Sequence, residues 1–194
     1  MIPAEHPCLS AQAHFRYGRI HLPVAPRCNI RCGYCDRRYD CANESRPGVT
    51  SEVISPEAAL DRVERALRLD SRLRVAGGAG PGEPPANPAT LETLRLIHAR
   101  FPRLLLCLST NGLVLSDALP ELLDCGVSTL TVTVNTRSVV CAGHVYRAVG
   151  GSADAGAMAA FLSAQQEGVA KAAEAGLTVK INTVVIPGFN TGEI

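Results

Sequence analysis

Aromatic side chains are scarce in this sequence of 194 residues, which has no tryptophan, four phenylalanines and four tyrosines. A buried core must therefore be built mainly from aliphatic side chains. Apolar residues make up 46% of the chain and charged residues 19%, which is the balance of a globular protein rather than a disordered one. The length suits one domain with a sizeable core and is short for two.

Charge of one sign and long apolar runs are also lacking. The formal net charge is +1 and the longest basic run is Arg37-Arg38, so nothing indicates nucleic acid or an anionic membrane as a partner. The first residues lack the basic and apolar regions of a signal peptide, and no apolar segment is long enough to span a membrane. We expect a cytoplasmic protein, whose eight cysteines are metal ligands or reduced thiols rather than disulfides.

Three of these cysteines occupy one short stretch, Cys28-Asn-Ile-Arg-Cys32-Gly-Tyr-Cys35, with the spacing C-x3-C-x2-C. Thiolates are the usual ligands of iron–sulfur clusters, and three of them can hold three corners of a four-iron cluster while the fourth iron stays open. A structural zinc site is the alternative, but zinc sites favour paired C-x2-C units with two further ligands. The spacing therefore favours an iron–sulfur cluster with an open iron.

The rest of the chain alternates between strand-like and helix-like patterns. We expect strands at 19–26, 72–76, 104–108, 128–134 and 177–186. We expect helices at 56–69, 88–101, 116–125 and 158–175. This order requires parallel pairing with right-handed crossovers. It predicts an α/β fold, a partial (β/α) barrel of about five parallel strands with helices outside.

Residues 1–18 form a polar lead-in without clear periodicity, and 19–194 should form the core domain. The carboxyl ends of parallel strands meet at one rim, so the unusual residues that follow the strands should form one site. In chain order these are the cysteine loop, Gly77 to Glu83, Ser109 to Asn111, Asn135, and Ile186-Pro187-Gly188. The glycines at 77–82 permit positive φ angles and a close approach of a ligand to the backbone, although a glycine-rich turn alone is usually only a turn.

The cysteine spacing resembles that of the radical S-adenosylmethionine (SAM) superfamily. In that superfamily SAM chelates the open iron, and reduction of the cluster releases a 5'-deoxyadenosyl radical. The resemblance implies that Cys28, Cys32 and Cys35 are the catalytic ligands of a 4Fe-4S cluster and that Tyr34 lies beside the adenine. The further SAM-binding residues that it implies are Gly78, Gly80, Gly82, Glu83, Ser109, Asn111, Asn135, Ile186 and Gly188.

Longer stretches closely resemble nitrogenase cofactor-assembly proteins of the NifB family. The run Arg19 to Gly48 is highly specific. The others are His6-Pro7-Cys8, Ala79 to Pro84, Ala86 to Pro88, Cys107 to Leu113 and Ile186 to Asn190. The resemblance implies an enzyme of the lyase or transferase type that fuses two 4Fe-4S clusters, with insertion of a SAM-derived carbide, into an eight-iron cofactor precursor. It also implies partner proteins that donate iron–sulfur clusters or carry the product, and a reductant.

Such an enzyme needs ligands for substrate clusters in addition to the SAM cluster. The candidates are Cys8, Cys41, Cys107 and His6, with His14 as an alternative to His6. Cys107 should share a strand face with Ser109, because side chains two residues apart point the same way. For Cys125 and Cys141 we expect burial in the core.

Two features depart from the NifB pattern. Residues 135–153 match only loosely, and the chain stops at Ile194, before a sixth strand and a cysteine-containing segment found in the family. We expect a fragment or a naturally shorter relative, in which barrel closure and full activity are in question. One alternative is another radical SAM activase or maturase. The other is a non-catalytic iron–sulfur carrier or a zinc-stabilised fold, and neither of these two needs to bind SAM.

Overall fold

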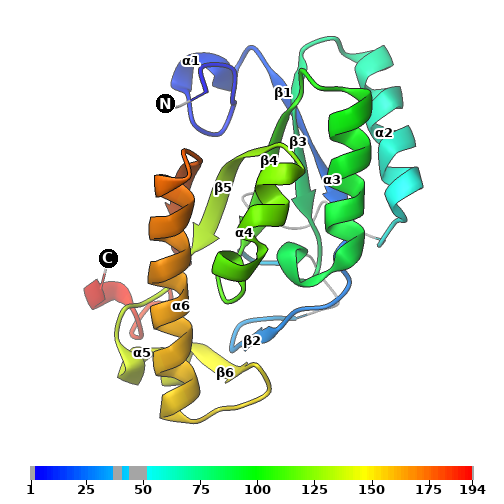
Figure 1. Cartoon of the computed structure of the whole chain (residues 1–194). Helices are drawn as coiled ribbons and strands as arrows, with labels where there is room; N and C mark the ends of the chain where they lie inside the picture. Colours follow the sequence, from blue (N-terminus) through cyan, green and yellow to red (C-terminus); the bar gives the residue numbers. More distant parts are fainter. Residues whose placement is uncertain (1–2, 37–40, 44–51, 194) are drawn as a thin grey trace.

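The computed structural model describes residues 3–36, 41–43 and 52–193. Five parallel strands form one sheet in the order β1-β3-β4-β5-β7 (Figure 1). They are β1 (Gly18–Pro23), β3 (Leu73–Ala79), β4 (Leu105–Thr110), β5 (Val127–Thr133) and β7 (Thr178–Asn182). The predicted α/β fold with five parallel strands is confirmed. Among the described strands the sheet is open, with β1 and β7 at its edges.

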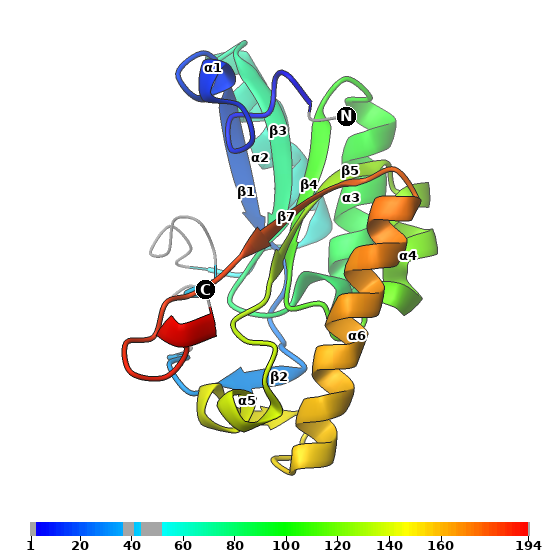
Figure 2. The ribbon, with the colours of Figure 1, turned by 90° about the vertical axis from the view of Figure 1, so that its left-hand side faces the viewer.

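Four long helices connect these strands and lie on one side of the sheet (Figure 2). They are α2 (Pro56–Leu69), α3 (Pro88–Arg100), α4 (Leu115–Asp124) and α6 (Ala155–Glu174). The caps of α2 and α6 are local: the Ser55 hydroxyl accepts from the Ala58 N–H, and the Asp154 carboxylate accepts from the Ala157 N–H. No helix in the described part of the chain combines the length and hydropathy needed to cross a bilayer.

The main core lies between the sheet and these helices and is aliphatic, as the scarcity of aromatic residues predicts. Strand β4 shows how the two faces of the sheet differ. Leu106 and Leu108 are fully buried beneath the helices, whereas Cys107 between them points to the opposite face and is only partly buried. That opposite face, here called the inner face, carries Cys107 and Ser109 of β4.

A second, smaller unit was not predicted from the sequence. Strands β2 (Ile30–Cys32) and β6 (Tyr146–Val149) pair antiparallel, and α5 (Val139–Val145) precedes β6. Their buried side chains pack with Met158 and Phe161 of α6 into a separate cluster. Strands of three and four residues are too short to show a period in the sequence, which is why the segment before α6 looked like a connection.

Three short helical turns complete the described structure. They are α1 (Ala11–His14) and the 3-10 turns η1 (Pro84–Ala86) and η2 (Thr191–Glu193). Figure 2 shows α1 at the amino end of β1, far from β2, which lies beyond its carboxyl end. The lead-in therefore sits at one end of the sheet and the cysteine loop at the other. The division into a lead-in of 1–18 and a core of 19–194 stays a prediction.

Candidate functional site

The cysteine loop leaves the carboxyl end of β1 and is fixed to the smaller unit. Gly33 N–H donates to the Val145 carbonyl at 2.7 Å, and Gly150 N–H donates to the Asn29 carbonyl at 2.9 Å. Cys32 is 7% exposed and packs in the cluster around Phe161, while Cys28 is half-buried and Cys35 is exposed. The three thiols therefore belong to one loop, which is anchored at the buried Cys32 and exposed to solvent at Cys35.

Burial raises the pKa of Cys32 to about 11, and the neighbouring Cys28 and Cys35 act in the same direction. The Cys35 N–H also donates to the Cys32 carbonyl at 3.2 Å, which keeps the second and third cysteines on one turn. Within the described ranges, no three Cys, His, Asp or Glu side chains are gathered so that they could hold a metal ion as they stand. The donor set nevertheless fits a 4Fe-4S cluster, because three thiols on one loop are the ligand type that such a cluster needs.

The glycine-rich stretch packs against the segment that leads into the cysteine loop. A Cβ on Gly80 would lie 2.8 Å from the Ala25 carbonyl oxygen, and a Cβ on Gly82 only 2.2 Å from that of Arg27. None of the glycines at 77, 78, 80 and 82 uses the positive φ angle that glycine permits. Gly80 and Gly82 instead allow two backbones to touch, and the first two glycines lie within β3.

Glu83 connects this stretch to the end of β4. Its side chain is 3% exposed, and its two carboxylate oxygens accept hydrogen bonds from the Thr110 hydroxyl and, at 2.8 Å, from the Asn111 N–H. The Asn111 side-chain amide in turn donates to Asn29 Oδ1 at 2.7 Å and lies 3.9 Å from the Cys28 sulfur. The structure thus brings the predicted residues Glu83 and Asn111 together with the cysteine loop.

Asn87 is a positioning residue that the sequence reasoning missed. Its buried side-chain amide donates to the carbonyls of Arg27 and Glu83, both at 2.7 Å, and its Oδ1 accepts from the Arg27 N–H at 3.3 Å. An asparagine directly before a proline is typical of the start of a helix, but the Asn87 side chain makes no cap hydrogen bond. No local signal separates an asparagine that caps a helix from one that ties two loops together.

Tyr34 and Asn135 are joined directly. The Tyr34 hydroxyl donates to Asn43 Oδ1 and accepts from the Asn135 side-chain amide, both at 2.7 Å. Asn135 is 1% exposed, and its Oδ1 accepts from the Val184 N–H at 2.9 Å. Burial also raises the pKa of the Tyr34 hydroxyl, so it stays protonated. The aromatic ring before the third cysteine is therefore held from the ends of β5 and β7.

Asn190 was also missed and organises the turn after β7. Its side-chain amide donates to the carbonyls of Asn135 and Val184 at 2.9 and 2.8 Å, and its Oδ1 accepts from the Ile186 N–H at 2.7 Å. Gly188 has φ +80°, and the Phe189 N–H donates to the Ile186 carbonyl at 3.0 Å. This is a turn with proline second and glycine third, which the sequence Ile-Pro-Gly-Phe favours. The signal that could have found Asn190 is its place directly after this turn, because asparagine side chains often bond to the backbone of turns.

The candidate substrate-cluster ligands do not gather in one place. Cys8 and His6 lie at the amino end of the sheet, where the Arg19 guanidinium donates to the Cys8 sulfur and the Cys8 N–H donates to His6 Nδ1 at 3.2 Å. His6 is 1% exposed, and its burial, together with the charge of Arg19, lowers its pKa to about 4. His14 Nδ1 lies 3.1 Å from the Pro7 carbonyl in the same region.

Cys107 lies on the inner face, nearer the cysteine loop. The strand register sets His21, Gly77 and Cys107 side by side, and a Cβ on Gly77 would lie 3.4 Å from the His21 ring. Because Gly77 has no side chain, the His21 ring lies directly against its backbone. His21 was missed by the sequence reasoning, although alternation along β1 places it on the face opposite the buried Leu22. Ser109 shares the half-buried face of Cys107, as expected.

The remaining three cysteines differ in burial. Cys125 and Cys141 are buried, and their thiols lie 3.6 Å from the Leu91 carbonyl and 3.3 Å from the Phe189 carbonyl. The prediction that these two are core thiols is confirmed. Cys41 is half-buried, and residues 37–40 and 44–48 of the motif that contains it lie outside the described residues.

A profile of the radical SAM superfamily matches residues 22–194. The chain belongs to the radical SAM superfamily. Its sequence is also 48% identical to the FeMo cofactor biosynthesis protein NifB of Klebsiella pneumoniae, over 96% of this chain and 41% of that protein. It is 40% identical to the NifB of Methanocaldococcus infernus, over 97% of this chain and 64% of the relative. The chain thus spans less than two thirds of the length of these curated relatives.

A solved structure has a similar arrangement of strands and helices. The structure of His6-tagged anSMEcpe with bound AdoMet aligns with a TM-score of 0.57 at 16% identity, over 86% of this chain and 42% of that one. At this identity the likeness concerns the arrangement of strands and helices alone. The roles of individual radical SAM residues in this chain remain predictions.

Proposed function

We propose that this chain is a radical SAM enzyme of nitrogenase cofactor biosynthesis, which fuses two 4Fe-4S clusters with a SAM-derived carbide into an eight-iron precursor. The observation that carries the proposal is the position of the three-cysteine loop, at the carboxyl edge of a parallel sheet and tied to Glu83 and Asn111. The identity to proteins named for FeMo cofactor biosynthesis supports the specific reaction.

Cys28, Cys32 and Cys35 would hold the 4Fe-4S cluster, which with SAM supplies one-electron cleavage of the sulfonium. The protein's part is to position the reactants. Glu83 fixes the turn that directs Asn111 toward Cys28, and Asn135 fixes the ring of Tyr34 at the other side of the loop. The remaining SAM-binding candidates lie on the same edge; they are Gly78, Gly80, Gly82, Ser109, Ile186 and Gly188.

Substrate clusters need further donors within reach of the SAM site. Cys107 and His21 face the same side of the sheet, separated in the strand register only by Gly77, which supports a cluster site on the inner face. Cys41 follows the cysteine loop and is a further candidate. We propose that cluster-donor proteins, a product carrier and a reductant complete the system.

The test is an anaerobic reconstitution with iron and sulfide, followed by SAM and a strong reductant and identification of the nucleoside products. S-adenosylhomocysteine together with 5'-deoxyadenosine is expected, since the proposal requires methyl transfer and radical chemistry. Deoxyadenosine alone would indicate a different radical SAM maturase. Iron loading without SAM binding would instead indicate an iron–sulfur carrier.

Cys32→Ala should abolish SAM cleavage, because a cluster with two protein thiolates loses the geometry that presents its open iron. Cys125→Ala is the matched control: it also removes a buried thiol, but one at the end of α4 in the main core. An active Cys32→Ala variant would refute the assignment of the loop.

A further inference from the structure

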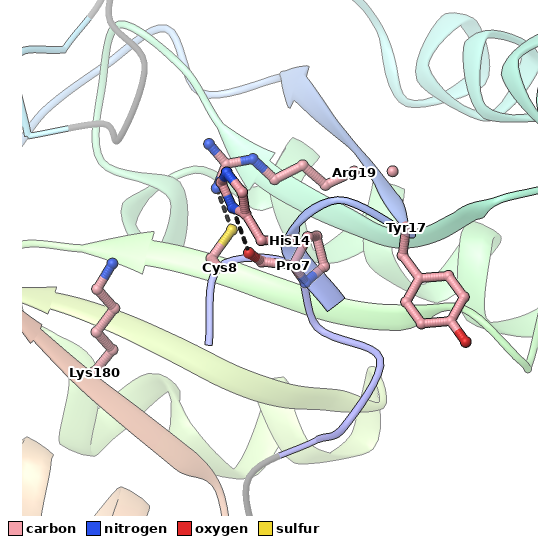
Figure 3. Close-up of a pocket in the computed structure, with 7 residues that line it drawn as sticks. Pro7, Cys8, His14, Tyr17, Arg19 and Lys180 are labelled. Carbon is pink, nitrogen blue, oxygen red and sulfur yellow. Dashed lines mark hydrogen bonds between the residues drawn. The ribbon is translucent and has the colours of Figure 1, made fainter. Parts of the chain in front are cut away.

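Hydrogen-bond donors lie beside cysteine sulfur atoms at both ends of β1. At the amino end, the Arg19 guanidinium donates to the sulfur of Cys8, which lines a cavity there (Figure 3). At the carboxyl end, the side-chain Nδ2 of Asn111 lies 3.9 Å from the sulfur of Cys28. Hydrogen bonds to sulfur are one of the means by which a protein sets the reduction potential of an iron–sulfur cluster. The amide groups around Cys28 therefore bear on the chemistry of the cysteine loop.

Three hydrogen bonds fix the position and the orientation of Asn111. Its N–H donates to the Glu83 carboxylate at 2.8 Å, and its carbonyl accepts from Gln165 Nε2 at 2.6 Å. Gln165 is 1% exposed and also donates to the Thr133 carbonyl at 2.8 Å, so it holds Asn111 from α6. Asn111 Oδ1 accepts from the Leu113 N–H at 2.9 Å, which settles which side of the amide is oxygen and which is nitrogen.

The orientation of Asn111 determines that of Asn29. Asn111 Nδ2 donates to Asn29 Oδ1 at 2.7 Å, and only an acceptor can face an NH2 group. The Asn29 side chain therefore presents its oxygen to Asn111 and turns its NH2 group away from it. The main chain of Asn29 is also held, because its carbonyl accepts from the Gly150 N–H at 2.9 Å.

The NH2 group of Asn29 is an orphaned donor. Its Nδ2 is buried and has no hydrogen-bond partner among the described residues. Removing an amide nitrogen from water without giving it an acceptor is costly, so buried groups of this kind are normally paired in a working protein. Asn29 directly follows Cys28, and the thiolate and sulfide atoms of a 4Fe-4S cluster on the loop would be negatively charged acceptors.

We propose that the Asn29 side-chain amide donates a hydrogen bond to a sulfur atom of the cluster on the three-cysteine loop and thereby raises the reduction potential of that cluster. The proposal rests on the proposed function, which requires a 4Fe-4S cluster at this loop. One electron from the external reductant makes the cluster sulfur atoms more negative. The hydrogen bond is therefore stronger in the reduced state than in the oxidised state, and it favours reduction.

The test measures the midpoint potential of the cluster by anaerobic reductive titration, followed by electron paramagnetic resonance. The chain carries Cys8→Ala, Cys41→Ala and Cys107→Ala, so that the cluster that is followed is the one on the cysteine loop. Asn29→Ala is expected to lower the equilibrium constant for reduction about tenfold, which is a shift of about 59 mV to more negative potential for one electron. Asn29→Asp should shift the potential at least as far, because it puts a negatively charged oxygen in place of the NH2 group.

Asn29→Asp also keeps an oxygen for the hydrogen bond from Asn111, so the test stays decisive even where Asn29→Ala fails to fold. Gln166→Glu is the matched control for the change from amide to carboxylate, since Gln166 is exposed on α6. It should leave the potential unchanged. In heavy water, hyperfine spectra of the reduced wild-type cluster should contain the coupling of an exchangeable deuteron that both Asn29 variants lack.

An unchanged potential in the Asn29 variants would overturn the proposal; weaker SAM binding alongside it would assign the amide to the SAM carboxylate instead. A shifted potential with the deuteron coupling retained would also overturn it, because the shift would then come from charge or structure and not from a hydrogen bond. A wild-type chain that loads no four-iron cluster would refute the proposed function as well. A shift with loss of the coupling, in a chain that forms no S-adenosylhomocysteine, would support this inference and refute only the proposed reaction.

Discussion

Replacing Gly82 by alanine should destabilise the chain and disturb the cysteine loop together. The new Cβ would lie 2.2 Å from the Arg27 carbonyl oxygen and 2.6 Å from that of Ala25, and both are backbone atoms that no rotamer change can move. Relieving the overlap requires a shift of about 1 Å. That shift breaks the hydrogen bonds from Gly82 N–H to Ala25 and from Glu83 N–H to Arg27, each 2.8 Å long.

The expected cost follows from these contacts. Two backbone hydrogen bonds contribute about 1 kcal/mol each, and overpacking adds about 1 to 3 kcal/mol. Gly82→Ala should therefore lower the free energy of unfolding by about 3 to 5 kcal/mol, and Tm by about 6 to 20 °C for a chain of this size. Because Arg27 directly precedes Cys28, iron loading of the cysteine loop should fall as well.

Thermal and urea unfolding followed by circular dichroism measures the effect, with Gly143→Ala as the control. Gly143 lies inside α5, with no atom within 4 Å of the position that a Cβ would take. There alanine should stabilise the helix by about 0.5 to 1 kcal/mol. A Gly82→Ala variant whose Tm lies within about 2 °C of wild type would show that the 25–27 and 80–82 segments do not pack as described.

Three further changes probe the partners of the site. Thr110→Val removes the hydroxyl that donates to buried Glu83, and should cost about 2 to 4 kcal/mol in urea unfolding; a loss below about 0.5 kcal/mol would contradict that contact. Asn190→Ala removes three hydrogen bonds from the turn after β7 and should speed proteolysis within 184–193; unchanged cleavage would show that the turn is held by other groups. Glu193 accepts from the Thr136 hydroxyl and from two backbone N–H groups, which holds its pKa below the usual range. The stabilisation by Glu193 is present above the pKa of the unfolded carboxyl group and is lost as pH falls through the pKa of the folded one, so proteolysis of the wild-type chain should become faster in acid. Glu193→Gln should remove this acceleration. An unaltered pH profile in the variant would contradict the contact.

The fold could be predicted because its long elements carry strong local signals. Ser55-Pro56 marks the start of α2, which has the predicted bounds. The alternation of strand and helix patterns is sufficient to predict the parallel sheet. The β2–β6 pair could not be predicted, because Ile30 and Val149 pair across more than a hundred residues of sequence. In addition, strands of three and four residues are too short for an alternating pattern to be recognised. Short strands are determined by their partners rather than by their own sequence.

For the site, the sequence predicts which residues gather but not what some of them do. The cysteine loop, Glu83, Asn111 and Asn135 converge as the strand-end argument requires. The sequence does not show which property of Gly82 the fold uses, since a glycine that admits a neighbouring backbone has the same letter as one that adopts positive φ. Asn87 and Asn190 were missed for a similar reason: a buried asparagine that bridges loops cannot be told from a cap until both loops are in place.

The candidate ligands at the two ends of β1 cannot share a single cluster. β1 has six residues, and a strand rises roughly 3.3 Å per residue, so its ends are about 17 Å apart. Iron–thiolate bonds are about 2.3 Å long, as are those of zinc, so one four-iron cluster cannot reach from Cys8 to Cys28. Any cluster on Cys8 is therefore distinct from the one on the cysteine loop. His21 and Cys107 lie on the inner face between these two ends, where a third group of donors can act without displacing either.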